Sequence, residues 1–380
     1  MIRIKKYSLL FIATLLSFSH LSCNDSDEIQ QTPEIDQRIK RIMSSVNMWV
    51  LTEEIAGGVV LIIRDGNIVL HEAVGLADIE EEIPMKKNHI FRIRSNTKPF
   101  VGTAILMLKE EGKISLDDAV ASYIPSFDTP DKRNVTIYQL LNHTSGLDGP
   151  SIWGKGFNTL WEAVEFIGNE YDFKFTPGTD YSYSNAGSST LGAVIQAITG
   201  DPPEVYIKER IIEPLVLDDT FCTLIPESDP RHERILPTYS KNNSSFSRVW
   251  DNTQPKPVPF FRCAGGMFST AIDYAKFLTM MLNEGNFNGI ELLSPETVRM
   301  ATRSQLDHIG MNRYGLHWMI MENVYTLSDI TPGSFGHNGS DGTIAFVDPE
   351  NKLVVVYFTQ TRGTGTRSLF IRYLYDAIYQ

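Results

Sequence analysis

Ser95 and Lys98 lie three residues apart in the stretch Ser95-Asn96-Thr97-Lys98, a spacing that could support nucleophilic catalysis. On a helix such residues share one face, so the Lys98 amine can reach the Ser95 hydroxyl. A free serine is a weak nucleophile, and Lys98 could act as its base if desolvation lowers the lysine pKa. Pro99 suits a first helical turn, whose free N–H groups could hold an oxyanion. The pattern predicts a nucleophile at the start of a helix that ends at Gly112, although Ser-x-x-Lys alone also occurs at solvated helix ends.

A second candidate element is Tyr183-Ser184-Asn185. In an extended segment residues two apart point the same way, so Tyr183 and Asn185 are predicted to face one cleft and Ser184 to face away. A nearby lysine ammonium would favour the Tyr183 phenolate, which could take the Ser95 proton and later protonate the leaving group. Asn185 could hydrogen-bond a substrate amide. For this segment alone, an aromatic loop packed on the core is the alternative.

A third element, Gly336-His337-Asn338-Gly339-Ser340, precedes the last predicted hairpin. Its glycines permit a close approach of the backbone to a ligand. Taken alone, the stretch could equally be a glycine-rich turn with a surface histidine.

The three elements in this order resemble the class C β-lactamase-like serine hydrolases, a penicillin-recognising family. The family includes class C β-lactamases, D-alanyl-D-alanine carboxypeptidases, D-amino-acid-specific peptidases and esterases. The resemblance extends from about residue 35 to the end of the chain. Three further stretches are similar to the family: Leu140-Leu141-Asn142-His143-Thr144-Ser145-Gly146-Leu147, Thr176-Pro177-Gly178 and Ala264-Gly265-Gly266-Met267-Phe268-Ser269-Thr270.

The resemblance implies a role for each candidate residue. Ser95 would be the acylated nucleophile, and Lys98 and Tyr183 would share proton transfer in an order that the motif leaves open. The implied substrate-binding residues are Asn185, His337 and Gly339. The backbone N–H groups of Ser95 and Ser340 would form the oxyanion hole. No cofactor is implied, and the eight histidines lack metal-ligand spacing, so no metal site is predicted.

The chain departs from the family at His337, where β-lactamases and carboxypeptidases of this group usually carry the lysine of Lys-Thr-Gly. With an ordinary pKa near ~6.5, histidine is mostly neutral at pH 7 and is a weaker anchor for a substrate carboxylate. The departure favours the esterase and aminopeptidase-like branches. It also predicts that His337→Lys improves the binding of carboxylate substrates.

Three functions are therefore weighed. The first is a serine hydrolase that acts through an acyl-enzyme on ester or amide substrates, including D-residue peptides or cell-wall fragments. The second is a class C-type β-lactamase, against which His337 argues. The third is a catalytically silent lipoprotein that binds cell-wall fragments or a partner. The complete set of Ser95, Lys98 and Tyr183 favours the first, because a binding module does not need all three. The neighbours His143 and Ser145 are interpreted as part of a helix end and turn rather than as a second catalytic pair.

The predicted elements place strands towards both ends of the chain and helices in the middle. A helix is predicted from Ile35 to Val50, a hairpin at 58–71 around Asp65-Gly66, a second hairpin at 343–358 and a helix at 366–379. The chain between is predicted to be mostly helical to about residue 245. We therefore expect an α/β (α+β) fold, with a mainly antiparallel sheet flanked by helices. Its α/β lobe would comprise about residues 35–100 and 250–380, with a helical lobe at about 101–249 and the site in the cleft between them.

The N-terminus predicts export. Basic residues precede an apolar run, Leu9 to Phe18, that is about half the ~20 residues needed to span a bilayer. Ser22-Cys23 then resembles a bacterial lipobox. Residues 1–23 are therefore predicted to be a lipoprotein-type signal with Cys23 as the lipid anchor, and 24–34 a tether; a plain cleavable signal peptide is the alternative. The expected location is extracytoplasmic and membrane-anchored, either periplasmic or surface-facing.

The composition limits the kinds of molecule that the protein is expected to bind. A formal net charge of -12 argues against nucleic acid, so a small-molecule or peptide substrate is expected. The remaining cysteines, Cys222 and Cys263, could pair in an oxidising compartment, but two buried free thiols are the favoured interpretation.

Overall fold

The structure is a computed structural model that describes residues 37–149, 152, 155–242, 245–254, 258–321 and 330–379. The predictions for the signal segment, Cys23 and the tether lie outside these residues. The helices are α1 (Gln37–Leu51), α2 (Lys98–Glu110), α3 (Ile137–Leu141), α4 (Leu160–Glu170), α5 (Asn185–Thr199), α6 (Pro203–Ile207), α7 (Ala271–Leu282), α8 (Pro295–Ala301) and α10 (Thr366–Tyr379). Among the short turns of helix, η1 (Arg94–Thr97) matters most for the site.

The central feature is a seven-stranded antiparallel sheet. Its order is β12 (Met319–Ile320), β13 (Phe335–Asn338), β14 (Ile344–Asp348), β15 (Leu353–Thr359), β1 (Gly57–Arg64), β2 (Asn67–Asp78) and β3 (Ile83–Pro84). Strands from the two ends of the chain meet where β1 pairs with β15. Both predicted hairpins are confirmed. Asp65 and Gly66 have φ values of 49° and 78°, as a two-residue turn with both central residues left-handed requires.

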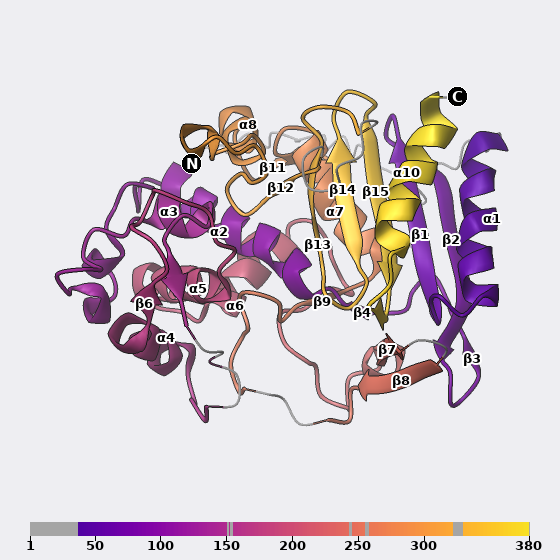
Figure 1. The fold of residues 1–380 in the computed structure, drawn as a ribbon, viewed down its shortest axis with the longest axis horizontal. Helices are drawn as coiled ribbons and strands as arrows, with labels where there is room; N and C mark the ends of the chain where they lie inside the picture. The colour runs from indigo at the N-terminus through magenta and orange to yellow at the C-terminus, as the bar shows by residue number, and fades with distance from the viewer. Residues whose placement is uncertain are drawn as a thin grey trace, which may run out of the picture.

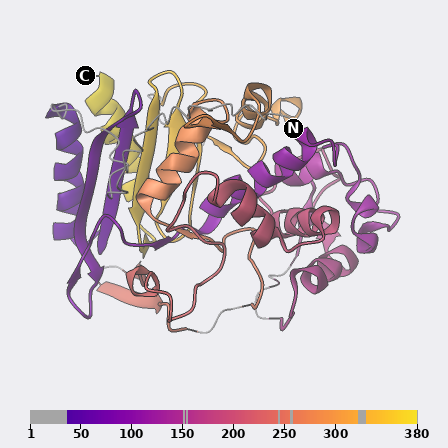
Figure 2. The same cartoon turned by 180° about the vertical axis from the view of Figure 1, so that it is seen from behind.

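Both faces of the sheet are buried, which explains why its central strands are apolar without a polar alternation. Along β1, Val59, Leu61 and Ile63 belong to one core cluster, and Val60 and Ile62 belong to another. Helix α7 covers the first face, and α1 and α10 cover the second (Figures 1 and 2). The predicted final helix at 366–379 is confirmed.

Helices α2 to α6 lie together to one side of the sheet (Figure 1). The first core cluster continues into them without a break, from the sheet through α2 to α4 and α5. The predicted fold class, an α/β (α+β) fold with a mainly antiparallel sheet, is confirmed. The lobe boundaries at about residues 100 and 250 stay predictions.

The expectation of a mostly helical chain as far as residue 245 is wrong for its last part. Strands β7 (Thr238–Asn242) and β8 (Ser245–Trp250) form a hairpin, and β16 (Thr361–Arg362) pairs with β7. Arg248 anchors the hairpin through ion pairs with Asp78 and Glu80, beside β3 (Figure 1). The contacts of this hairpin with β16, Asp78 and Glu80 come from distant parts of the sequence, so local pattern could not reveal them.

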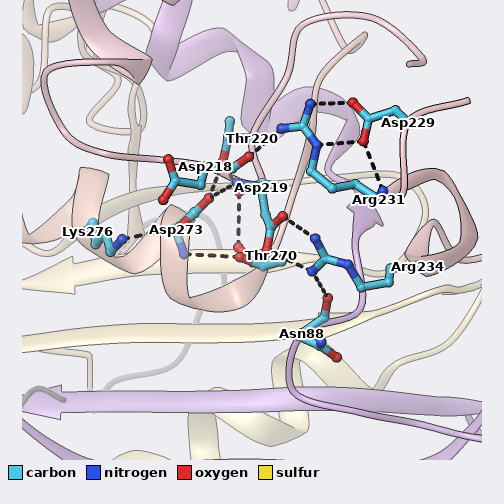
Figure 3. Close-up of polar contacts among 11 residues, drawn as sticks. Asn88, Asp218, Asp219, Thr220, Asp229, Arg231, Arg234, Thr270, Asp273 and Lys276 are labelled. Atoms are coloured by element: carbon cyan, nitrogen blue, oxygen red, sulfur yellow. Dashed lines mark hydrogen bonds and ion pairs between the residues drawn. The ribbon is translucent and has the colours of Figure 1, made fainter. Parts of the chain in front are cut away.

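A polar network fastens the segment 218–234 to the start of α7 (Figure 3). Asp219 accepts a hydrogen bond from Arg234 at 2.8 Å, and its own N–H donates to the Asp273 carboxylate at 2.7 Å. Thr270 caps α7 by accepting from the Asp273 N–H. The network holds the junction between β9 (Phe268–Ser269) and α7 in place. This junction comes directly after residues that contact the candidate site.

The remaining short strand pairs are β4 (Phe91–Arg92) with β9, β5 (Leu147–Asp148) with β6 (Asp172–Phe173), and β10 (Asn286–Phe287) with β11 (Ile290–Glu291). Cys222 and Cys263 are buried and unpaired, as predicted. Within the described ranges, no helix combines the length and apolar character needed to cross a membrane.

Candidate active site

Ser95 lies in η1, a tight turn between β4 and α2. The turn begins at Arg94, whose φ of 52° lies in the left-handed region that costs a non-glycine residue about 1–2 kcal/mol. Buried neighbours hold this conformation. The Asn96 amide donates to Thr343 Oγ1 at 2.9 Å, and the Thr97 hydroxyl accepts from the Met267 N–H at 3.1 Å. Tertiary contacts therefore fix Ser95, as strained backbone at functional sites requires.

Lys98 is the first residue of α2 and is fully buried, with 0% of its surface exposed. Its Nζ donates to Asn185 Oδ1 and to the Ala264 carbonyl, both at 2.9 Å. Neither partner carries a charge. Burial, followed by the positive charges of Arg94 and Arg262, lowers the pKa of Lys98 well below its ordinary value. The surroundings therefore favour a neutral amine, which is the form that can accept a proton.

The Tyr183-x-Asn185 segment has the predicted alternation. Ser184 is buried, accepts from the Gly187 N–H at 3.0 Å and caps α5, whereas Asn185 is exposed and Tyr183 is 40% exposed. The Lys98 Nζ lies 4.5 Å from the centre of the Tyr183 ring, and the Tyr183 hydroxyl interacts with the Ser95 side chain by a hydrogen bond. The structure therefore brings Ser95, Lys98, Tyr183 and Asn185 together.

The expectation that Tyr183 would be a phenolate is not supported. Burial around the hydroxyl raises its pKa, the hydrogen bond with Ser95 lowers it by less, and Lys98 is not among the causes. The 40% exposed surface means that solvent offsets part of the rise. The physical reason is that the buried surroundings of the hydroxyl penalise the negative charge of a phenolate.

His337 lies in β13 and is buried, with 1% of its surface exposed, so it is not the surface histidine of the alternative interpretation. Its Nε2 lies 3.0 Å from the Tyr314 hydroxyl, and its Nδ1 accepts from the Asn338 N–H at 2.9 Å. Burial, with a smaller contribution from Lys98, lowers the pKa of His337 to about 3. The ring is therefore neutral, as predicted, but both of its nitrogens contact protein groups. Its predicted contact with substrate stays a prediction.

Gly339 allows the loop after β13 to approach the nucleophile turn. A Cβ atom at this position would lie 2.3 Å from the carbonyl oxygen of Ile93 and 2.3 Å from Thr343 Oγ1. Arg94 Nε donates to the Ser340 hydroxyl at 3.1 Å across the same junction. Within the described part of the chain, the N–H groups of Ser95 and Ser340 donate to no protein group. These two amides therefore remain available for the predicted oxyanion role.

The family profile described as Beta-lactamase matches residues 35–379. This chain belongs to the beta-lactamase family. Its predicted resemblance is thereby confirmed. The family is a group of hydrolases with esterase, amidase and carboxypeptidase relatives.

Individual relatives of the beta-lactamase family show how far the similarity extends. A putative D-alanyl-D-alanine carboxypeptidase from Escherichia coli (strain K12) is 28% identical over 337 residues, covering 78% of this chain and 76% of the relative. EstCE1, a hydrolase with promiscuous acyltransferase activity, is similar with a TM-score of 0.77 and 24% identity over 91% of this chain and 99% of that one. The D-amino acid amidase from Ochrobactrum anthropi SV3 has a TM-score of 0.72 and 23% identity over 90% and 98% of the two chains. The structural similarities show a shared fold.

Sequence reasoning missed how His143 supports this beta-lactamase-family site. Its carbonyl accepts from the Ser182 N–H at 3.0 Å, its Nδ1 accepts from the Ser184 N–H at 3.3 Å, and its ring centre lies 4.6 Å from that of Tyr183. His143 thus contacts Tyr183 and both of its neighbours. The interpretation of 143–146 as a helix end and turn is confirmed, because α3 ends at Leu141 and His143 has a φ of 61°. The family-like stretch at 140–147 was the available signal.

Proposed function

We propose that this protein is a serine hydrolase that forms an acyl-enzyme at Ser95 with ester or amide substrates. The observation that carries the proposal is the fully buried Lys98 amine, which has two neutral hydrogen-bond acceptors and lies 4.5 Å from the centre of the Tyr183 ring. A desolvated lysine of this kind is a base near neutral pH, and a serine needs such a base.

In the proposed reaction, neutral Lys98 takes the Ser95 proton, directly or through the Tyr183 hydroxyl, as Oγ bonds to the substrate carbonyl carbon. The N–H groups of Ser95 and Ser340 donate to the oxyanion. Collapse of the tetrahedral intermediate breaks the bond to the leaving oxygen or nitrogen, which receives that proton. Water then attacks the acyl-enzyme by the same proton route and releases the acid and Ser95. The raised pKa of Tyr183 supports Lys98 as the first base.

Asn185 has a double role in this proposal. Its Oδ1 accepts from Lys98, and its exposed side chain leaves the amide nitrogen to donate to a substrate acyl group. The amidase and carboxypeptidase relatives support amides and D-residue or cell-wall peptides as substrates. Efficient β-lactam hydrolysis is not favoured, because His337 is neutral and buried where a lysine would supply a positive charge.

The test is the intact mass of the protein after incubation with a penicillin and, in parallel, with 4-nitrophenyl butyrate and a fluorophosphonate probe. We expect one covalent fluorophosphonate adduct and ester hydrolysis in the wild type. Both should be lost in Ser95→Ala, with ester turnover falling about 10³-fold or more. Ser145→Ala is the matched control, since Ser145 lies close to His143 in the sequence and is buried in the turn. An adduct on Ser95→Ala, or loss of labelling in a folded Ser145→Ala protein, would contradict the assignment.

We also propose that Cys23 carries a lipid that anchors the protein outside the cytoplasm. The support is the sequence alone: a basic start, a short apolar run and Ser22-Cys23 before an acidic stretch.

A further inference from the structure

A cavity of about 320 Å³ adjoins the candidate active site, and both Tyr183 and Asn185 line it. The Tyr183 hydroxyl shares a hydrogen bond with the Ser95 side chain, and Asn185 Oδ1 accepts from Lys98 at 2.9 Å. Two residues of the candidate catalytic unit therefore form part of the cavity wall. An acyl group on Ser95 that extends past the side chain of Asn185 enters this space.

Another part of the wall comes from β5 and the residue after it, and a hydrogen bond ties β5 to the catalytic segment. Ser184 lies between Tyr183 and Asn185, and its hydroxyl donates to the Leu147 carbonyl at 3.0 Å. Asp148 follows Leu147 and lines the cavity. Bond lengths limit the separation between the α-carbons of Ser184 and Asp148 to about 8 Å. An acyl chain of a few methylene groups that passes Asn185 can therefore reach Asp148.

The charge of this cavity comes from one carboxylate. Among the described residues that line the cavity, Asp148 is the only one with a charged side chain, and it is exposed. No ion pair in the described ranges involves Asp148. The lysines of the neighbouring segments have other contacts, since Lys155 Nζ lies 4.8 Å from the centre of the Phe166 ring and Lys174 Nζ lies 3.5 Å from Ser182 Oγ. The described wall is therefore negative.

An aromatic ring borders the cavity next to this carboxylate. A Cβ atom on Gly149 would lie 2.6 Å from the ring of Tyr171, so the segment after Asp148 passes against that ring. Burial, followed by the negative charge of Asp148, raises the pKa of Tyr171. The face of an aromatic ring also attracts cations. Across the strand pair Asp148 lies opposite Asp172, and a bound cation would reduce the repulsion between these like charges.

We propose that this cavity binds a positively charged group on the acyl part of the substrate, with Asp148 as the residue that determines this specificity. The preferred substrates would be esters or amides whose acyl group carries an ammonium, including peptides in which the reacting residue has a basic side chain. The Asp148 carboxylate would form a charge-assisted hydrogen bond with the ammonium, and the Tyr171 ring would contact the cation or its methylene groups. This inference rests on the proposed acylation of Ser95.

The kinetic test compares two 4-nitrophenyl esters of matched shape, 6-(trimethylammonio)hexanoate and its neutral carbon isostere 7,7-dimethyloctanoate. The measured quantity is the ratio of kcat/KM for the charged ester to that for the neutral ester. Asp148→Asn should lower this ratio about threefold or more, as expected for a solvent-accessible charge pair. In the wild type the ratio should also fall as the salt concentration rises from about 0.02 M to about 0.5 M, and this dependence should weaken in Asp148→Asn. Any change at Lys98 affects both esters and cancels in the ratio.

The matched control is Asp172→Asn, which removes the same charge from the paired strand at a residue that does not line the cavity. It should change the ratio by less than about twofold. An unchanged ratio in a folded Asp148→Asn protein, or an equal loss in Asp172→Asn, would overturn the inference.

Binding of the two corresponding methyl esters to Ser95→Ala, measured by ligand-observed NMR, tests the cavity without chemistry. Adding Asp148→Asn should weaken the binding of the charged ester about threefold or more and leave that of the neutral ester unchanged. An equal effect on the two compounds would sink the cavity assignment. Charge-dependent binding as expected, without ester turnover in the wild type, would instead reject the proposed hydrolase function.

Discussion

At the scale of single residues, Lys98 determines the chemistry that this site can perform. Lys98 is buried, and its two hydrogen-bond partners are uncharged, so its neutral form is favoured because desolvation penalises the ammonium. The same residue contacts Asn185, Ala264 and the face of Tyr183, so the base and the candidate proton shuttle form one unit. Such groups titrate together, and a pH profile reports the set rather than one residue.

The lowered pKa of Lys98 predicts the pH dependence of kcat/KM. Activity should rise as the pH increases through the folded-state pKa of Lys98, since the neutral amine is the active form, and it should reach its plateau below pH 10.5, the ordinary lysine value. The measurement is ester hydrolysis from about pH 5 to about pH 11.5, corrected for the uncatalysed hydrolysis of the ester. Lys98→Arg introduces a guanidinium that stays protonated and cannot accept the proton, so it should lower kcat by about 10²–10⁴ at every pH. A rise that is complete only above pH 10.5 would show that Lys98 is not desolvated.

At the scale of elements, loops between regular segments determine where the reactive groups lie. The nucleophile turn, the segment before α5 and the loop after β13 come from three distant parts of the chain. Each is held by hydrogen bonds to a neighbour, as Thr343 holds Asn96 and His143 holds Ser182 and Ser184. Substitutions that shift a loop should therefore reduce activity more than stability.

Gly339→Ala should displace the loop after β13 from the nucleophile turn. Its Cβ would lie 2.3 Å from two oxygen atoms, so the loop must move and the Ser340 N–H with it. We expect kcat to fall about 100-fold, as displacements near 1 Å can cause, with a stability loss of about 1–3 kcal/mol. Gly365→Ala is the control, because nothing lies within 4 Å of a Cβ there. Unchanged ester kinetics in Gly339→Ala would show that the loop position does not matter.

His143→Ala should misplace Tyr183. The substitution removes the acceptor for the Ser184 N–H and the ring beside Tyr183 but leaves the Ser182 contact to the backbone. We expect kcat to fall about tenfold or more with little change in KM, because proton transfer depends on the position of the hydroxyl. His143→Asn, which tolerates positive φ and retains an acceptor, should recover part of the loss. A change confined to KM would exclude this positioning role.

At the scale of the whole molecule, strands from the two ends of the chain pair with each other, and this pairing completes both the sheet and the site. β1 pairs with β15, about 300 residues later in the sequence, counting from Gly58 to Thr359. This pairing completes the sheet that also contains the third motif. In the sequence, helices α2 to α6 lie between β1 and β15. One core cluster joins these helices to the sheet. Sheet and site therefore depend on the same long-range pairing.

The proposed lipid anchor is also a property of the whole molecule. Full-length wild type expressed in a Gram-negative bacterium should partition with membranes if the proposed lipid on Cys23 anchors the chain. Cys23→Ser should release the protein into the soluble fraction without changing ester kinetics. If wild type and Cys23→Ser partition alike, the segment is a plain signal peptide or serves another purpose.

Sequence alone determined the local elements. Two apolar runs around Asp65-Gly66 predicted the first hairpin, and apolar residues at helical spacing predicted the first helix. The order of Ser95, Lys98, Tyr183 and the glycine-flanked third motif predicted the family, which the profile match confirmed. Each of these elements and motifs consists of residues close together in the chain. A pattern within one segment is therefore sufficient to find it.

Tertiary structure alone decided the electrostatics and the unexpected pairings. The lowered pKa of Lys98, the raised pKa of Tyr183 and the burial of His337 depend on protein atoms from other segments. Strand β7 pairs with β16, and β4 pairs with β9, although the partners lie far apart in the sequence. The physical reason is that desolvation and charge interactions act through space, whereas sequence patterns report only neighbours along the chain.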